Sequence, residues 1–229
     1  MKVPPSIFND VLGPVMRGPS SSHSAAANRI GRLMRALAGE KISTLVVRYD
    51  PNGSLVTTHK EQGSDLGLYG GILGWTPDDP RLPTFEQALE DEGIEINLHY
   101  ESYDAPHPNF YRLEAHGVSG TIYHFDAIST GGGMIETISI DGIPFTSAGD
   151  YHHILIWTKD APELPPDLAA EIVSIHKSDE GQHPSISVSV KSLIKQRFRR
   201  SQKSSQPAVS DTFLPSCPSS HAIKLKFLS

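Results

Sequence analysis

The sequence predicts an α+β fold, with a mostly antiparallel sheet and helices packed on it. Three observations predict this class. Helical patterns dominate residues 20–93, a run of four strand-like segments follows over residues 94–142, and the connections between these strands have hairpin length. A doubly wound parallel sheet would instead alternate strands and helices along the chain.

The first predicted helix covers residues 20–39. Its apolar residues recur at helical spacing, and Gly39 is a typical stop signal. Two strands are expected next, over 42–50 and 54–59. The segment Asp50-Pro51-Asn52-Gly53 lies between them, and its Asn-Gly pair favours a tight hairpin.

The later elements follow from the same reading. A helix over 64–75 contains glycines that lower helix propensity, which indicates close packing against another element. A short polar helix is expected over 83–93, and a last helix over 165–178. The strands of the main sheet are predicted at residues 94–102, 109–116, 121–129 and 134–142.

Composition limits the class of protein. The chain has 229 residues, a net charge of −6 and one cysteine, Cys217, so it has no internal disulfide. No apolar run approaches the roughly 20 residues of a membrane helix, and the N-terminus lacks the apolar stretch of a signal peptide. We therefore expect a cytoplasmic protein that binds neither membranes nor nucleic acid.

The C-terminal segment differs in charge from the rest. Residues 191–229 hold eight basic residues and one acidic residue, and the segment is rich in Ser and Pro. We expect three parts: a main domain over 1–157, a short helical extension over 158–195 and a disordered basic tail over 196–229. Nucleic-acid binding by the tail is a weaker alternative, because no aromatic stacking platform accompanies it.

The first polar loop precedes the 20–39 helix. Ser20, Ser21, Ser22 and His23 stand where the helix would begin. Unpaired backbone N–H groups and the helix dipole attract anions there, and an imidazole can move a proton near neutral pH. The hypothesis is a site for a substrate carboxylate; the alternative is an ordinary serine N-cap.

Two further loops carry candidate residues. Asp65 ends the segment 59–65, where it is either a ligand-binding group or a helix cap. Ser129 and Thr130 precede a run of three glycines, of which Gly131 and Gly132 permit close backbone approach to a ligand. The alternative for this loop is a wide hairpin turn or a bulge. His107 is a candidate proton carrier or a surface residue.

Taken in order, these loops resemble a known family. The sequences GPVMRGPSSSHS (13–24), QGSDLGLYGGILGW (62–75), HPNFYRL (107–113) and STGGGMIETISIDG (129–142) are similar to the beta chain, or beta domain, of iron–sulfur-dependent L-serine dehydratase. The similarity covers roughly residues 6–157. It implies a fold like the allosteric substrate-binding domain of phosphoglycerate dehydrogenases.

The resemblance also implies an activity. The family converts L-serine into pyruvate and ammonia with a four-iron four-sulfur cluster held by an alpha domain or subunit, so we expect an oligomer with such a partner. His23 would be the catalytic residue. The implied substrate-binding residues are Ser20, Ser21, Ser22, Asp65, Ser129, Thr130, Gly131 and Gly132.

Two features depart from the family pattern. Gln62 stands where the family motif has a histidine, and glutamine is neither an acid nor a base. One cysteine cannot supply three cluster ligands, so this chain would hold no metal. The alternative function is a non-catalytic regulatory module that binds serine or a hydroxy acid.

Overall fold

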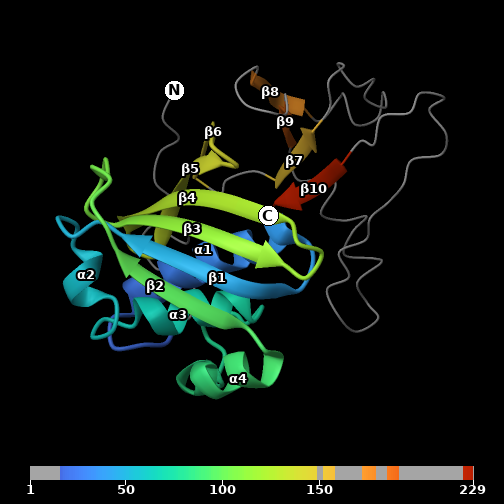
Figure 1. Cartoon of the computed structure of the whole chain (residues 1–229). Helices are drawn as coiled ribbons and strands as arrows, with labels where there is room; N and C mark the ends of the chain where they lie inside the picture. Colours follow the sequence, from blue (N-terminus) through green and yellow to red (C-terminus); the bar gives the residue numbers. More distant parts are fainter. Residues whose placement is uncertain (1–15, 149–151, 158–171, 179–184, 191–223, 229) are drawn as a thin grey trace. The chain divides into compact units, whose positions relative to one another are not determined.

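The computed structural model describes residues 16–148, 152–157, 172–178, 185–190 and 224–228 (Figure 1). The chain divides into two compact units, Met1–Ala148 and Gly149–Ser229. Each unit has its own sheet. The fold is α+β, as predicted.

The first unit is built on a six-stranded sheet. Its strand order is β2-β1-β3-β4-β5-β6. The bounds of these strands are β1 Ile42–Tyr49, β2 Glu95–Tyr100, β3 Phe110–Gly117, β4 Ile122–Gly131, β5 Met134–Ile140 and β6 Ile143–Ser147. The last strand was not predicted.

The sheet is mixed, so the predicted mostly antiparallel sheet is wrong at one edge. Strand β1 pairs antiparallel with β3 but parallel with β2. Several helices separate β1 from β2 along the chain: α2 Leu55–Thr58, α3 Ser64–Ile72, the short 3-10 helix η2 Leu82–Thr84 and α4 Phe85–Glu92. This long crossover returns the chain to the starting end of β1, which makes a parallel partner possible.

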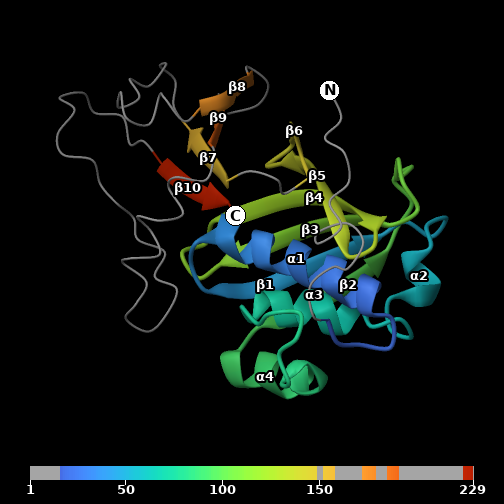
Figure 2. The ribbon, with the colours of Figure 1, turned by 180° about the vertical axis from the view of Figure 1, so that it is seen from behind.

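Helix α1 (Ser21–Ala38) and helix α3 cover one face of the sheet (Figure 2). They approach closely at glycines. A Cβ atom placed on Gly31 would lie 2.2 Å from the Leu68 carbonyl oxygen, and one on Gly71 would lie 2.3 Å from the Asn28 carbonyl oxygen. The glycines that weaken α3 as a helix are therefore the residues that allow this contact.

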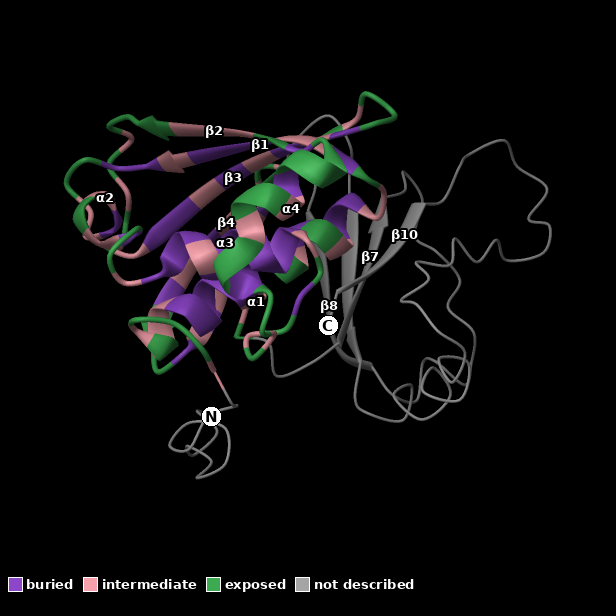
Figure 3. Ribbon diagram, turned by 90° about the horizontal axis from the view of Figure 1, so that it is seen from below, coloured by how far each residue is buried: buried purple, intermediate pink, exposed green. Residues whose placement is uncertain are grey.

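The core lies between the two helices and the sheet (Figure 3). Ile30, Leu45, Leu68 and Leu113 are fully buried in it. Helix α4 lies farther out and buries only Leu89. The core thus holds α1 and α3 in a fixed position, and both helices begin at the candidate site described below.

The predicted hairpin at residues 50–53 is wrong. Residues 55–58 form the one-turn helix α2 instead of a strand. Both sides of β1 are already paired, to β2 and β3, so no hairpin partner can be added. The Asp50 carboxylate instead holds the turn, because it accepts hydrogen bonds from the backbone N–H groups of Asn52, Tyr103 and Ala105.

The second unit contains a four-stranded antiparallel sheet in the order β10-β7-β9-β8. The strands are β7 His152–Trp157, β8 Ile172–Ser178, β9 Ser185–Val190 and β10 Lys224–Leu228. The helix predicted over 165–178 is wrong over 172–178, where the segment IVSIHKS contains three β-branched residues and pairs with β9. Its first half lies outside the described residues.

Within the predicted extension residues 172–178 and 185–190 are strands, and within the predicted tail residues 224–228 are a strand. The functional division at residues 157 and 195 stays a prediction. None of the helices in the described ranges is long and apolar enough to cross a membrane.

Candidate functional site

The loops that the sequence singles out gather at one end of the six-stranded sheet (Figures 1 and 2). The C-terminal ends of β1, β2 and β4 meet there with the beginnings of β3 and β5, as their pairing requires. The first turns of α1 and α3 lie at the same end. Segments far apart in the sequence thus form one neighbourhood.

Ser20 is the N-cap residue of α1, but its side chain does not cap the helix. Its Oγ lies 2.8 Å from Nδ1 of His23, so hydroxyl and imidazole are hydrogen-bonded to each other. His23 is partly exposed, and Ser21 is exposed beside it. The first turn of α1 contains no acidic residue. The N–H groups of this turn have no partner within the helix, and together with its partial positive charge they suit an anion.

The second loop packs directly against this turn. A Cβ atom on Gly63 would lie 2.7 Å from Oγ of Ser24, and one on Gly67 would lie 2.0 Å from the Ser24 carbonyl oxygen. Ser24 is buried, and its Oγ has no hydrogen-bond partner among the described residues. Asp65 lies in the first turn of α3, between these two glycines. The structure therefore brings Asp65 close to the serine–histidine loop.

The third loop reaches the same turn from the other side. Residues Gly131, Gly132 and Gly133 all have positive φ, and the β4–β5 pairing has a register shift between Ser129 and Gly131. A Cβ atom on Gly133 would lie 3.3 Å from Cβ of Ala25, and Arg29 donates a 3.4 Å hydrogen bond to the Gly133 carbonyl. The glycine run thus forms a turn beside α1.

The remaining residues of the third loop differ in exposure. Thr130, Gly131 and Gly132 are at or near the surface. Ser129 is buried, and its backbone N–H donates to the carbonyl of Asn109. Substrate binding by these residues stays a prediction.

A buried histidine links the second loop to the sheet. Nδ1 of His59 lies 2.7 Å from Oδ2 of Asp65, and Nε2 lies 2.7 Å from the hydroxyl of Tyr100. His59 is held at the end of α2, where its backbone N–H donates a hydrogen bond to the Leu55 carbonyl. Burial raises the pKa of Asp65, and the bond to His59 opposes that rise. Oδ1 of Asp65 is buried and has no partner in the described part of the chain.

Sequence reasoning did not find Tyr100 or Arg29 as members of this neighbourhood. Both belong to regular elements, β2 and α1, and their partners are distant in sequence. No local pattern marks such pairs.

Three tyrosines surround the Asp65 side chain. Burial raises the pKa of Tyr49 and Tyr69, and raises the pKa of Tyr111 to about 12. The negative charge of Asp65 acts in the same direction on all three. These hydroxyls therefore stay protonated at neutral pH.

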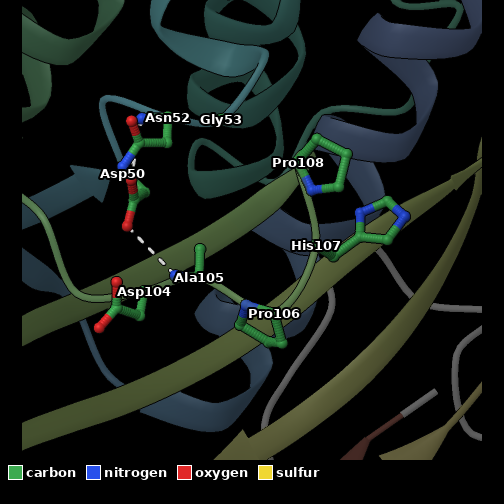
Figure 4. Close-up of a pocket in the computed structure, with 8 residues that line it drawn as sticks. All are labelled: Asp50, Asn52, Gly53, Asp104, Ala105, Pro106, His107 and Pro108. Atoms are coloured by element: carbon green, nitrogen blue, oxygen red, sulfur yellow. Dashed lines mark hydrogen bonds between the residues drawn. The ribbon is translucent and has the colours of Figure 1, made fainter.

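A pocket lies between the loops 50–53 and 104–108 (Figure 4). None of the predicted catalytic or substrate-binding residues lines it. His107 and Asp50 line the pocket. Nδ1 of His107 accepts a hydrogen bond from the backbone N–H of Asn109, and the Asp50 carboxylate accepts hydrogen bonds from backbone N–H groups. These bonds assign both side chains to loop structure.

The described residues contain no group of three or more His, Cys, Asp or Glu that can hold a metal ion. The single cysteine, Cys217, lies outside the described residues. One thiolate falls short of the three that an iron–sulfur cluster requires. The chain by itself therefore does not fit such a cluster.

Comparison with known proteins identifies the family. No family model matches the sequence. A probable L-serine dehydratase beta chain of Bacillus subtilis (strain 168) is 37% identical over 155 residues, which is 68% of this chain and 69% of the relative. The L-serine dehydratase beta chain of Peptoniphilus asaccharolyticus is 32% identical over 148 residues, which is 64% of this chain and 66% of the relative. This chain belongs to the L-serine dehydratase beta-chain family.

Proposed function

We propose that this chain supplies the substrate-binding loops of an L-serine dehydratase that forms pyruvate and ammonia in the cytoplasm. The proposal rests on one observation. The Ser20 hydroxyl is bonded to His23 instead of capping α1, so an imidazole is fixed beside the N–H groups of the helix start. This combination suits an amino acid that must be held by its carboxylate and also exchange a proton.

The carboxylate of L-serine would bind at the first turn of α1. This helix has 18 residues and no acidic side chain in its first turn. The buried Oγ of Ser24 has no hydrogen-bond partner within the described ranges, and this supports a polar ligand nearby, because such a hydroxyl is costly to leave without a partner. Ser21 and Ser22 add hydroxyl groups to the same turn.

His23 would move the proton. Its Nδ1 is occupied by Ser20, so Nε2 is the ring nitrogen left to exchange a proton with the substrate. The bond from Ser20 also restricts the rotation of the ring. Positioned acid–base groups of this kind contribute about 10²–10⁴-fold to a rate.

The cluster would be carried by an alpha subunit or domain, and the working enzyme would be an oligomer containing both parts. The beta-chain names of the relatives support a partner. The chemistry of this chain supports it as well, since the sequence contains one cysteine.

A regulatory role is the alternative, and Gln62 is the observation that favours it. Gln62 occupies the place of the family's motif histidine and cannot act as an acid or a base. In that case the same loops would bind serine without chemistry.

An anaerobic assay that follows pyruvate separates the two functions. The chain is tested alone and with a cluster-loaded alpha subunit from the same source. We expect activity only in the mixture, and we expect His23→Ala to reduce it at least 100-fold. A matched control is His124→Ala, whose side chain is 56% exposed on the outer face of the sheet. Serine binding by the chain alone, with no activity in either sample, would favour the regulatory function.

A further inference from the structure

The buried chain of hydrogen bonds through His59 has a geometry suited to proton transfer. A carboxylate, an imidazole and a phenol follow one another, with both contacts at 2.7 Å. His59 is 3% exposed and Asp65 is 8% exposed, whereas Tyr100 is 49% exposed. The three groups thus lead from the interior at α3 to the surface at the end of β2.

We propose that Asp65, His59 and Tyr100 form a proton relay that ends at the Tyr100 hydroxyl, and that the relay provides a second acid–base group for the dehydratase site. The inference rests on the proposed function. In it, Tyr100 exchanges the proton at the surface, while His59 and Asp65 are positioning residues.

The direction of the bonds follows from the donor and acceptor roles. A carboxylate only accepts, so Nδ1 of His59 carries a hydrogen and donates it to Asp65. In the neutral ring Nε2 then has a lone pair, which accepts a hydrogen bond from the Tyr100 hydroxyl. When Tyr100 passes its proton to Nε2, the imidazolium that forms is stabilised by the Asp65 carboxylate. The phenolate oxygen can then take a proton from the substrate. When the Tyr100 hydroxyl passes that proton on to the departing hydroxide, which leaves as water, the proton stored on Nε2 returns to the phenolate oxygen and the starting state is restored.

The relay begins beside the serine–histidine loop. Asp65 lies between Gly63 and Gly67, the two residues at which α3 meets Ser24 of α1. Tyr100 ends β2 at the same end of the sheet, where it pairs with Tyr49 of β1. Both acid–base groups therefore lie at the end of the sheet where α1 begins.

Titratable side chains from several elements lie around Asp65 in the described part of the chain. The titratable side chains that act on Asp65 or feel its charge are Tyr49 from β1, Tyr69 from α3, Tyr111 from β3 and Lys60 from the intervening loop. Burial raises the pKa of each of these tyrosines. These phenols therefore stay neutral, and the imidazole of His59 is the group whose ring nitrogens lie within hydrogen-bond distance of both Asp65 and Tyr100.

The first test measures the protonation of His59 by ¹⁵N NMR in the full chain at pH 8. We expect a neutral ring with the hydrogen on Nδ1, and a change of the Nε2 signal in Tyr100→Phe. A hydrogen on Nε2, or an Nε2 signal that Tyr100→Phe leaves unchanged, would overturn the relay. Phenylalanine keeps the ring that lies 5.9 Å from the imidazole, so the variant is expected to fold.

The second test measures steady-state kinetics with the alpha subunit. We expect Tyr100→Phe to lower kcat about 100-fold with KM within about twofold, and Asp65→Asn to lower kcat in the same way. The matched control is Tyr103→Phe, which removes a hydroxyl bonded to the Arg48 carbonyl and should leave kcat unchanged.

The outcomes separate the relay from the proposed function. Equal kcat values for Tyr100→Phe and the unmodified enzyme would refute the use of the relay while the dehydratase function stands. A reconstituted enzyme without any activity would refute the function, and with it the catalytic use of the relay, even if the NMR signals show the bonds.

Discussion

The close contact between α1 and α3 predicts a large effect of a single methyl group. In Gly67→Ala the new Cβ would lie 2.0 Å from the carbonyl oxygen of Ser24, whereas real Cβ atoms essentially never come within 3.0 Å of such an atom. The obstacle is backbone, so the helices must separate by roughly 1 Å. Each van der Waals contact across the widened gap then loses a quarter to a half of its attraction energy.

The expected magnitude combines two opposing effects. Overpacking costs about 1–3 kcal/mol, and we expect the upper end because the obstacle cannot rotate away. Alanine returns about 1 kcal/mol of helix propensity relative to glycine. The net loss in the free energy of unfolding is therefore about 2 kcal/mol for Gly67→Ala.

The assay is urea unfolding followed by tryptophan fluorescence. A Trp157→Phe background leaves Trp75 as the only tryptophan, and Trp75 is buried just after α3. The matched control is Gly70→Ala in the same helix, where the close contact of the new Cβ is with Cδ2 of Leu82, the end of a side chain, at 2.3 Å, while Asn28 Nδ2 and Trp75 Cε3 lie at ordinary distances of 3.6 and 3.7 Å. We expect the control to stay within about 1 kcal/mol of the parent. If Gly67→Ala is as stable as Gly70→Ala, the argument from backbone contact is wrong.

Three further predictions concern the same unit. Asn28→Ala removes buried hydrogen bonds from Nδ2 to the carbonyls of Gly67 and Trp75, so we expect a loss of about 2–4 kcal/mol in urea unfolding; a loss below 1 kcal/mol would contradict this. Backbone N–H groups that donate to the Asp50 carboxylate lower its pKa. The ionised carboxylate therefore stabilises the fold at pH values above the ordinary pKa of 3.8, and this stabilisation disappears as the pH falls through the lower pKa of the folded state. Asp50→Asn should be less stable than the parent at pH 7, with a difference that shrinks at low pH, and a pH-independent difference would refute the charge effect. Gly133→Ala introduces a side chain at φ +81, which should weaken calorimetric serine binding several-fold, and unchanged affinity would show that this turn does not shape the site.

Much of the first unit could be predicted from local sequence. The apolar spacing around Ile30 and the stop at Gly39 predicted α1, and the glycines of residues 64–75 predicted close packing of α3. The strand predicted at 54–59 is wrong. The Asn-Gly signal is local, whereas β1 pairs with β2 and β3, which lie far along the chain.

The candidate site shows the same division. The Ser20–His23 bond spans three positions and follows from a helix start, so its residues stood out in the sequence. The hydrogen bond from His59 to Tyr100 joins residues 41 positions apart. Gln62 is recognisable as unusual only by comparison with the family motif, which has a histidine at that position. Contacts that depend on sheet order are set by tertiary structure, and local patterns do not carry them.

The position of β1 in the sheet has a consequence for synthesis of the chain. Thr44 of β1 pairs with Glu95 of β2 and with His116 of β3, so both partners leave the ribosome long after β1 itself. Until then a strand rich in β-branched residues, ISTLVVRY, has two unpaired edges. Nascent chains that stall before Gly117 should therefore be the ones most prone to aggregate and most in need of a chaperone.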